Sequence, residues 1–525
     1  MMRTKAVGRC FLVLILSLLL PAATLAQQRQ GRPNGNPTQC PAQQQPQAQQ
    51  QQPEQRREAG PGVLRLLPAD SVTEHSIELA NGKTLAYTAT AGTLALYDQS
   101  GEQTAAVFYT AYVAKSSGDA PRPLTFAFNG GPGAASAYLH LGLVGPKILQ
   151  FGPQNDPATA QLRNNPQTWL EFTDLVLIDP VGTGWSRAAK SDGAEAFRGV
   201  RRDAEFFAKV IALYVAKNGR SASPKYLLGE SYGGFRAAKV ARALQQDQGI
   251  AVSGIAMVSP MLEGSLQFGG DRFALGAALH LPSIVAAELE RTGSMSQEAL
   301  AQAERFAMTE YLTTIAGPPP RGEAARAFYA QLAKMTGIPE EDVAKSRGFL
   351  RDLYLKNLRS ADGRVVSRYD GSFSVDDPFP DSRGERNPDP VLDGYTRAYA
   401  GAFVGYARDA LGFQTDMTYV LLSSETSGNW NWREGGRGDP SVSEDLRILI
   451  SFSPSFRLMI AHGYADLVTP HMASRYVIDH LPPFTNPERV QLKLYSGGHM
   501  FYVSDDARKS FTADMKAFFD AGRGS

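Results

Sequence analysis

The chain has 525 residues, with 53 Lys and Arg against 52 Asp and Glu and a formal net charge of +1. Because the charges balance and the sequence has no Lys/Arg-rich block, it lacks the basic surface that a nucleic-acid-binding protein needs, and this class of protein is excluded. The hydrophobic share of 43% is that of an ordinary globular protein, and the length allows about two to four domains or one large core with an insertion. The only cysteines, Cys10 and Cys40, precede the globular part. A disulfide within the fold and a cysteine-based zinc site are therefore excluded.

Residues 1–26 have the pattern of a secretory signal peptide. A basic start that ends at Arg9 is followed by an apolar run at residues 11–20 and by small residues at 24–26. The run is short for a membrane span, which needs about 20 residues, and an uncleaved anchor is the alternative. No comparable run follows, so we expect no stable membrane span after cleavage. Export to a bacterial periplasm, or secretion, is the expected location.

Residues 27–62 have a different composition, dominated by Gln, Pro, Arg and Gly. Such a segment has little apolar surface to offset the entropy of ordering, so we expect a disordered spacer. A tether to a cell-envelope partner is the functional alternative, which nothing in the sequence favours.

The pattern of a packed domain begins at Val63. Residues 71–113 alternate apolar and polar side chains between turn signals, as in antiparallel hairpins. Helical spacing of apolar residues predicts a helix over 200–217. Short apolar runs predict buried strands at 124–128, 175–178, 226–228, 255–258, 458–461 and 490–495. Strands that alternate with helices predict an α/β fold with a mostly parallel sheet.

The alternation of strand and helix stops near residue 265. Residues 265–393 carry mainly helix-forming sequence, with helices predicted over 297–315, 322–335 and 340–358. We therefore divide the globular part into a first core segment (63–264), a helical cap insertion (265–393) and a second core segment (394–525). Ligands of open sheets bind at the carboxyl ends of the strands, so an insertion there would shape substrate access.

A candidate nucleophile lies at residues 229–234, which read Gly-Glu-Ser-Tyr-Gly-Gly. Glycines around Ser231 permit the tight turn between strand and helix that exposes a serine hydroxyl, and the flanking segments have the required strand and helix character. The helix N-terminus beside the serine favours developing negative charge. The alternative is an ordinary glycine-rich turn.

A serine nucleophile needs a general base and a carboxylate that orients it. Of the seven histidines, His499 follows a predicted strand end in a flexible loop, and we interpret the other six as structural. Asp466 directly follows the predicted strand 458–461, whereas Asp439 and Asp445 are weaker candidates. Ser231, Asp466 and His499 then stand in the chain order of the α/β-hydrolases.

Residues 129–133, Asn-Gly-Gly-Pro-Gly, follow a predicted strand and are suited to an oxyanion hole. Bare glycine backbone can bring an N–H group close to a reacting carbonyl. The expected donors are the N–H groups of Gly131 and of Tyr232, the residue after the nucleophile. Alone, the segment could be only a turn.

Together these motifs resemble the serine carboxypeptidases. The resemblance rests on residues 129–133, on 179–186 (Asp-Pro-Val-Gly-Thr-Gly-Trp-Ser), on 229–233, and on Asp466 with the Gly-His-Met of 498–500. It implies an α/β-hydrolase that removes single amino acids from the C-termini of peptides through an acyl-enzyme. In that family the Asn and Glu that correspond to Asn129 and Glu230 bind the substrate's terminal carboxylate.

Two departures from the family pattern stand out. Residues 134–136 are Ala-Ala-Ser where well-known members have Cys-Ser-Ser, and residues 141–144 supply no second Glu to share a proton with Glu230. A Glu that faces a substrate carboxylate is repulsive unless one of the two is protonated. We therefore expect peptide binding to weaken as pH rises through neutrality, while the missing second Glu leaves the strength of this acid preference open.

Two other functions are compatible with the same residues. A serine acyltransferase or esterase would use the same scaffold and triad, and a non-catalytic peptide-binding envelope protein would not need the triad at all. The mechanism requires no metal and no organic cofactor, and the expected partners are peptides with a free C-terminal carboxylate. The tryptophans of residues 429–432 are expected to be core residues rather than pocket residues.

Overall fold

The computed structural model describes residues 61–115, 118, 120–152, 156–267, 273–381, 389–434 and 439–523. The predicted signal peptide, both cysteines and the spacer up to residue 60 lie outside these ranges. Within them, no helix combines the length and the apolar character that a membrane crossing requires.

The central sheet contains ten strands and begins with antiparallel hairpins. β1 (Ser71–Glu78), β2 (Thr84–Tyr97) and β3 (Gln103–Ala114) pair in order, and this confirms the hairpins predicted for residues 71–113. β3 also pairs antiparallel with the short β8 (Arg187–Ala188) and with β7 (Asp174–Ile178), where the parallel part of the sheet begins.

The rest of the sheet is parallel, as predicted. The neighbours in order are β7 (Asp174–Ile178), β4 (Leu124–Phe128), β9 (Lys225–Glu230), β10 (Gly254–Val258), β13 (Arg457–Gly463) and β14 (Val490–Tyr495). Each of them contains one of the predicted apolar runs. Because these strands are parallel, their carboxyl ends meet at one edge of the sheet.

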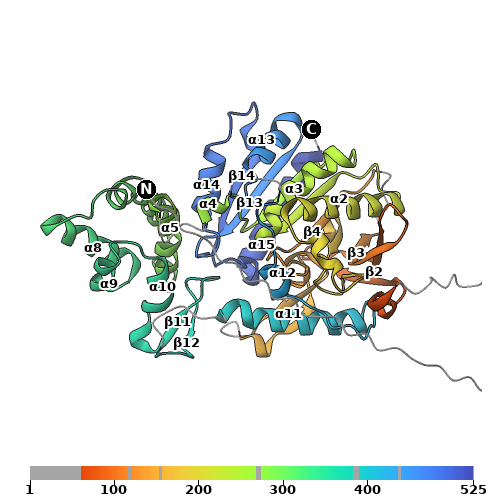
Figure 1. Ribbon diagram of the computed structural model, residues 1–525, viewed down its shortest axis with the longest axis horizontal. Coiled ribbons are helices and arrows are strands. Elements are labelled where there is room, and N and C mark those ends of the chain that lie inside the picture. The colour runs from red at the N-terminus through yellow and green to blue at the C-terminus, as the bar shows by residue number, and fades with distance from the viewer. Residues whose placement is uncertain are drawn as a thin grey trace, which may run out of the picture. The chain divides into compact units, whose positions relative to one another are not determined.

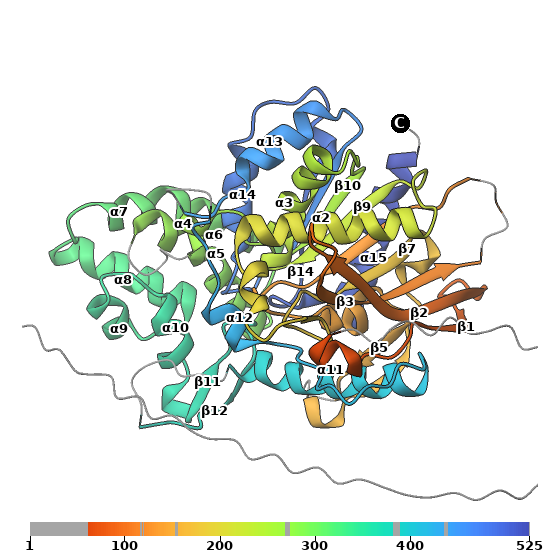
Figure 2. The same ribbon diagram turned by 45° about the vertical axis from the view of Figure 1, so that its right-hand side comes forward.

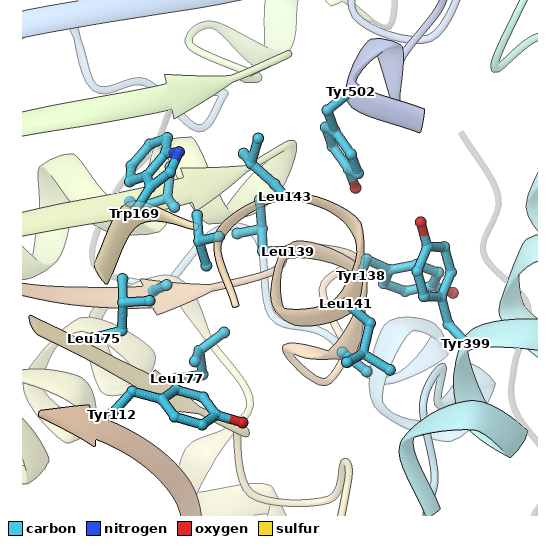
Figure 3. Packing of buried hydrophobic residues seen from close by; sticks show 14 of the residues in the cluster. Tyr112, Tyr138, Leu139, Leu141, Leu143, Trp169, Leu175, Leu177, Tyr399 and Tyr502 are labelled. Carbon is cyan, nitrogen blue, oxygen red and sulfur yellow. The ribbon is translucent and has the colours of Figure 1, made fainter. Parts of the chain in front are cut away.

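Both faces of the inner parallel strands are covered, which explains their continuous apolar runs. The strand predicted as buried at 490–495 is an exception, because β14 lies at the edge of the sheet and is only half-buried. Val176 and Ile178 belong to one core cluster, while Leu175 and Leu177 belong to another, so alternate residues of β7 face opposite layers. The first cluster includes α2 (Val200–Lys217), α3 (Tyr232–Asp247) and α13 (Ser443–Phe452) (Figure 2). The second, part of which Figure 3 shows, includes α1 (Ala137–Leu139), η2 (His140–Val144), α11 (Pro390–Asp409) and α15 (Asp505–Arg523).

The insertion is mainly helical and has an apolar core of its own. Figure 1 shows its helices α8, α9 and α10 grouped apart from the strands of the central sheet. It comprises α5 (Ala274–Arg291), α6 (Gln297–Phe306), η7 (Ala307–Tyr311), α7 (Leu312–Ala316), α8 (Gly322–Thr336), α9 (Glu340–Lys345), α10 (Arg351–Asn357) and the hairpin of β11 (Arg364–Val366) and β12 (Ser374–Asp376). The remaining strands and α-helices are β5 (Lys147–Gln150), β6 (Gln161–Asn164), α4 (Gly264–Gln267), α12 (Ser424–Gly428) and α14 (His471–Asp479).

One prediction about a helix of the insertion is wrong. The helix predicted over 340–358 is broken between α9 and α10, because Arg347 and Gly348 have φ angles of 57° and 86°, outside the right-handed helical region. The boundary predicted at residue 393 falls within α11. The buried face of α11 belongs to the sheet's core cluster, so this helix starts before the predicted second core segment.

Candidate active site

Ser231 lies in a sharp turn between β9 and α3. Its φ and ψ angles are 60° and −125°, a sparsely populated backbone conformation for a residue with a side chain. A Cβ atom at Gly229 would lie 1.9 Å from the carbonyl oxygen of Gly233, so the turn cannot close without glycine there. The turn predicted from the sequence is confirmed, with Ser231 directly before the first residue of the helix.

The glycine segment after β4 packs against this turn. β4 and β9 are neighbours, with Phe128 paired to Gly229, so the residues that follow each strand are adjacent. A Cβ at Gly130 would lie 2.5 Å from the backbone nitrogen of Tyr232. Gly131 has a φ of 100° and lines the same cavity as Ser231. The two proposed oxyanion donors, Gly131 and Tyr232, thus belong to segments in close contact.

His499 and Asp466 form a buried pair at the carboxyl ends of β14 and β13. Nδ1 of His499 lies 2.8 Å from Oδ2 of Asp466, and the two residues are 3% and 0% exposed. A carboxylate only accepts hydrogen bonds at neutral pH, so it holds the proton of the neutral imidazole on Nδ1 and leaves Nε2 as the basic atom.

Asp466 is fixed by the turn in which it lies. Its Oδ1 accepts the backbone N–H groups of Val468 at 2.8 Å and Thr469 at 3.0 Å, and the Thr469 hydroxyl lies 2.6 Å from its Oδ2. Burial alone would raise the pKa of Asp466, but the charge and hydrogen bond of His499, with those of Thr469, hold it below its ordinary value. Burial likewise opposes the charged imidazole, yet Asp466 and Glu230 raise the pKa of His499 above its ordinary value.

Glu230, the last residue of β9, is 4% exposed. Its Oε2 accepts hydrogen bonds from Nδ2 of Asn129 at 3.0 Å and from the Tyr502 hydroxyl at 2.6 Å. Burial raises the pKa of Glu230 to about 7, although these two donors and His499 oppose that rise. Glu230 is therefore a neutral acid over much of the range below neutrality.

A single cavity of about 340 Å³ brings the predicted residues together. Its lining contains the serine, the histidine and both candidate carboxylate-binding residues, as well as Gly131: Asn129, Gly131, Glu230, Ser231 and His499. Asp466 lies behind His499, and Tyr232 contributes its backbone at the start of α3 rather than lining the cavity with its side chain. The buried Trp430 packs edge to face on Tyr232, in the core as predicted.

The other six histidines form hydrogen bonds elsewhere in the fold. The side chains of His140 and His462 are buried, and burial lowers the pKa of each imidazole to about 3. The partners are Thr73 for His75, Tyr112 for His140, the Gly276 carbonyl for His280, Ser474 for His462, Glu304 for His471 and the Tyr476 carbonyl for His480.

A strap from the insertion, residues 367–373, is hydrogen-bonded to the loops that carry Asp466 and His499. The carbonyl of Tyr369 accepts the backbone N–H of His499 at 2.6 Å, and that of Arg368 accepts the N–H of Leu467 at 3.1 Å. The Tyr369 ring also stands edge to face against the His499 ring, with centroids 5.2 Å apart. Tyr369 and Met500 line both the cavity that Ser231 lines and a second cavity of about 370 Å³, whose lining also includes Asp370.

Sequence reasoning missed three residues of this site. Thr469 had a local signal, because a hydroxyl three residues after an aspartate commonly completes a turn around the carboxylate. Tyr502 lies three residues after His499, but its contact with Glu230 joins segments 272 residues apart. Tyr369 lies in the insertion, and no spacing in the sequence connects it to His499.

Comparisons with known proteins identify the family of this chain. Residues 85–499 match the model of the family described as serine carboxypeptidase. Among solved structures, a prohormone-processing carboxypeptidase from Saccharomyces cerevisiae is similar with a TM-score of 0.53 at 14% identity, over 82% of this chain and 91% of that one. A monoglyceride lipase from the same yeast gives a TM-score of 0.35 at 13% identity, over 81% and 94%. A search among curated protein sequences finds no significant match. The family model covers most of the length of this chain. The chain therefore belongs to the serine carboxypeptidase family, whose members are peptidases of the α/β-hydrolase fold.

Proposed function

We propose that this peptidase releases C-terminal amino acids from peptides through an acyl-enzyme formed on Ser231. The observation that carries the proposal is the composition of one cavity. Ser231 and His499, which perform acyl transfer, line it together with Asn129 and Glu230, which recognise a terminal carboxylate. A peptide whose last carboxylate lies against Glu230 has its final amide bond near the neighbouring Ser231.

His499 acts as general base and then as general acid. Its Nε2 takes the proton of the Ser231 hydroxyl as the oxygen attacks the scissile carbonyl carbon, and Asp466 stabilises the imidazolium that forms. The N–H groups of Gly131 and Tyr232 stabilise the negative oxygen of the tetrahedral intermediate. His499 then protonates the leaving amine, and a water molecule activated by His499 hydrolyses the acyl-enzyme.

The terminal carboxylate of the substrate is recognised by Asn129 and by protonated Glu230. Since burial raises the pKa of Glu230 to about 7, the group is a hydrogen-bond donor at pH 5 and a repelling anion at pH 8. Peptide binding should therefore weaken above neutrality.

The test compares a blocked dipeptide with its C-terminal amide at pH 5 and pH 7, for wild type and Ser231→Ala. We expect cleavage of the free acid alone, with the variant slower by about 10⁴-fold or more. Cleavage of the amide at a comparable rate would remove the role of Asn129 and Glu230 and favour an esterase or acyltransferase. A wild-type protein that neither cleaves nor reacts with a serine-directed phosphonate would favour a non-catalytic binding protein.

We also propose that the protein works outside the cytoplasm. The support is the signal-like pattern of residues 1–26. Fractionation of cells that express the full chain with a C-terminal tag tests this, and tagged protein found only in the cytoplasm, with residues 1–26 intact, would contradict it.

A further inference from the structure

The two carboxyl oxygens of Glu230 have different surroundings. Oε2 accepts two hydrogen bonds, one from the Asn129 amide at 3.0 Å and one from the Tyr502 hydroxyl at 2.6 Å. Among the residues that the structure describes, none donates a hydrogen bond to Oε1. Glu230 nevertheless lines the catalytic cavity. Oε1 is therefore the oxygen left for a ligand.

Tyr502 is held firmly in the position that this hydrogen bond requires. It lies in η10 (Phe501–Val503) and is 0% exposed. A Cβ at Gly142 would lie 2.5 Å from Cε2 of its ring, so the ring packs directly on the backbone of η2. Figure 3 shows Tyr502 approaching Tyr138 and Tyr399 from a different segment of the chain.

Tyr502 is a donor at every pH at which the enzyme would work. Burial first, and then the charge of Glu230, raises its pKa well above the ordinary value, so the phenol keeps its proton. A second carboxyl group at this place would instead share a proton with Glu230, and the two groups would repel each other once both were ionised. The resemblance to well-known serine carboxypeptidases implies such a second Glu, but this chain has Gly142 in the corresponding stretch and a phenol against Glu230.

The other titratable groups around Glu230 do not share its titration range. Asp466 has a lowered pKa and stays ionised, and the neighbouring tyrosines have raised pKa values and stay neutral. His499 is the exception, since its own pKa is raised from an ordinary value near neutrality. The titratable groups that interact electrostatically with Glu230 are Tyr138, Tyr369, Tyr399, Asp466, His499 and Tyr502.

We propose that Tyr502 is a positioning residue. Together with Asn129 it donates hydrogen bonds to Oε2 of Glu230. The single carboxyl proton therefore lies on Oε1, where it faces the substrate's terminal carboxylate. An oxygen that already accepts two hydrogen bonds is a poor site for that proton. Protonated Oε1 then donates to the substrate, and no second acidic residue is needed. The inference rests on the proposed carboxypeptidase function and names the group that orients its carboxylate site.

The test is Tyr502→Phe, with Tyr399→Phe as the matched control. The Tyr399 hydroxyl is buried and has no hydrogen-bond partner among the described residues, so its loss should leave binding unchanged. For Tyr502→Phe we expect KM for a blocked free-acid dipeptide to rise about five- to tenfold at pH 5, with kcat within about twofold. Loss of a donor to the ionised carboxylate also raises the pKa of Glu230, so the rise of KM with pH should begin at a higher pH than in wild type.

Each outcome has a defined consequence. The inference is overturned if KM and its pH dependence are the same in Tyr502→Phe as in wild type and in Tyr399→Phe. This holds even if the wild type discriminates free acids from amides as proposed. A wild type that does not discriminate overturns the proposed function itself, and the inference with it. If Tyr502→Phe does not fold, as judged by thermal unfolding, Gly142→Ala displaces the ring while keeping the hydroxyl. An unchanged KM in Gly142→Ala would then overturn the inference.

Discussion

Glu230→Gln is the substitution that separates the charge of this site from its shape. Glutamine keeps the size of the side chain and can accept from Asn129 and Tyr502 while its amide N–H₂ faces the cavity. The variant therefore imitates protonated Glu230 at every pH. Wild type and variant should bind peptides similarly at pH 5, where Glu230 is neutral, and differ at pH 8.

The expected effect on stability follows from the pKa of Glu230. Burial raises it from 4.5 to about 7, a difference equivalent to about 3 kcal/mol at about 1.4 kcal/mol per pH unit. The folded state binds this proton more tightly than the unfolded state, so the stabilisation is fully present below pH 4.5 and is lost as pH rises to about 7. The free energy of unfolding of Glu230→Gln minus that of wild type should thus increase by about 3 kcal/mol between pH 4 and pH 8.

The same titration governs binding. Above the pKa of Glu230, the protonated fraction of the free enzyme falls about tenfold per pH unit, so the wild-type Kd for a free-acid peptide should be about tenfold weaker at pH 8 than at pH 6. In Glu230→Gln the Kd should stay flat. Both Kd values are measured on a Ser231→Ala background, where no turnover occurs. The free energy of unfolding is measured by urea denaturation.

Groups that titrate in this range without interacting with Glu230 contribute equally to both proteins, whereas His499 does not, because Glu230 helps to raise its pKa. Burial also raises the pKa of Asp179 to about 7, but Asp179 is present in both proteins and its contribution cancels in the difference. A stability difference that does not change from pH 4 to pH 8, together with a wild-type Kd that stays flat, would refute the assignment of Glu230 as a buried, proton-holding carboxylate.

Three further substitutions test separate parts of the site. Asp466→Asn should lower kcat by about 10⁴-fold, because the imidazole loses the partner that fixes its tautomer. Steady-state kinetics checks this on a variant whose thermal unfolding is unchanged, and only a small loss of kcat would exclude Asp466 from the triad. Asn129→Ala should raise KM for free-acid peptides by about ten- to a hundredfold through loss of a donor to charged groups, and an equal effect on C-terminal amides would contradict its role. Leu467→Ala should lower the free energy of unfolding by about 2–5 kcal/mol, measured in urea, because Leu467 is fully buried. A change below about 0.5 kcal/mol would contradict this packing role.

The inner parallel strands could be predicted because they are buried on both faces. The apolar run at residues 124–128 corresponds to β4, which is buried throughout, and residues 490–495 correspond to the half-buried edge strand β14, both with the predicted bounds. The prediction failed where the backbone conformation depends on local detail. Arg347 takes a positive φ although nothing in its residue type requires it, so the break between α9 and α10 is not visible in the apolar spacing.

The site was predictable to the extent that its residues follow strands. Asn129, Ser231, Asp466 and His499 each come at or soon after the carboxyl end of a parallel strand, and parallel strands bring those ends together. Tyr502 was not predictable in this way, since its contact with Glu230 depends on how η10 packs over η2.

The bonds between the insertion and the triad loops bear on what the insertion does. The strap at residues 367–373 accepts the N–H of His499, accepts the N–H of Leu467, and donates the N–H of Gly371 to Ala465 at 2.9 Å. Ala465 and Leu467, on either side of Asp466, also belong to the apolar core of the insertion. A segment that only covered the cavity would have no such contacts with the loops that carry Asp466 and His499. The insertion is therefore part of the framework that positions Asp466 and His499, and changes in its core should reduce kcat as well as alter substrate choice.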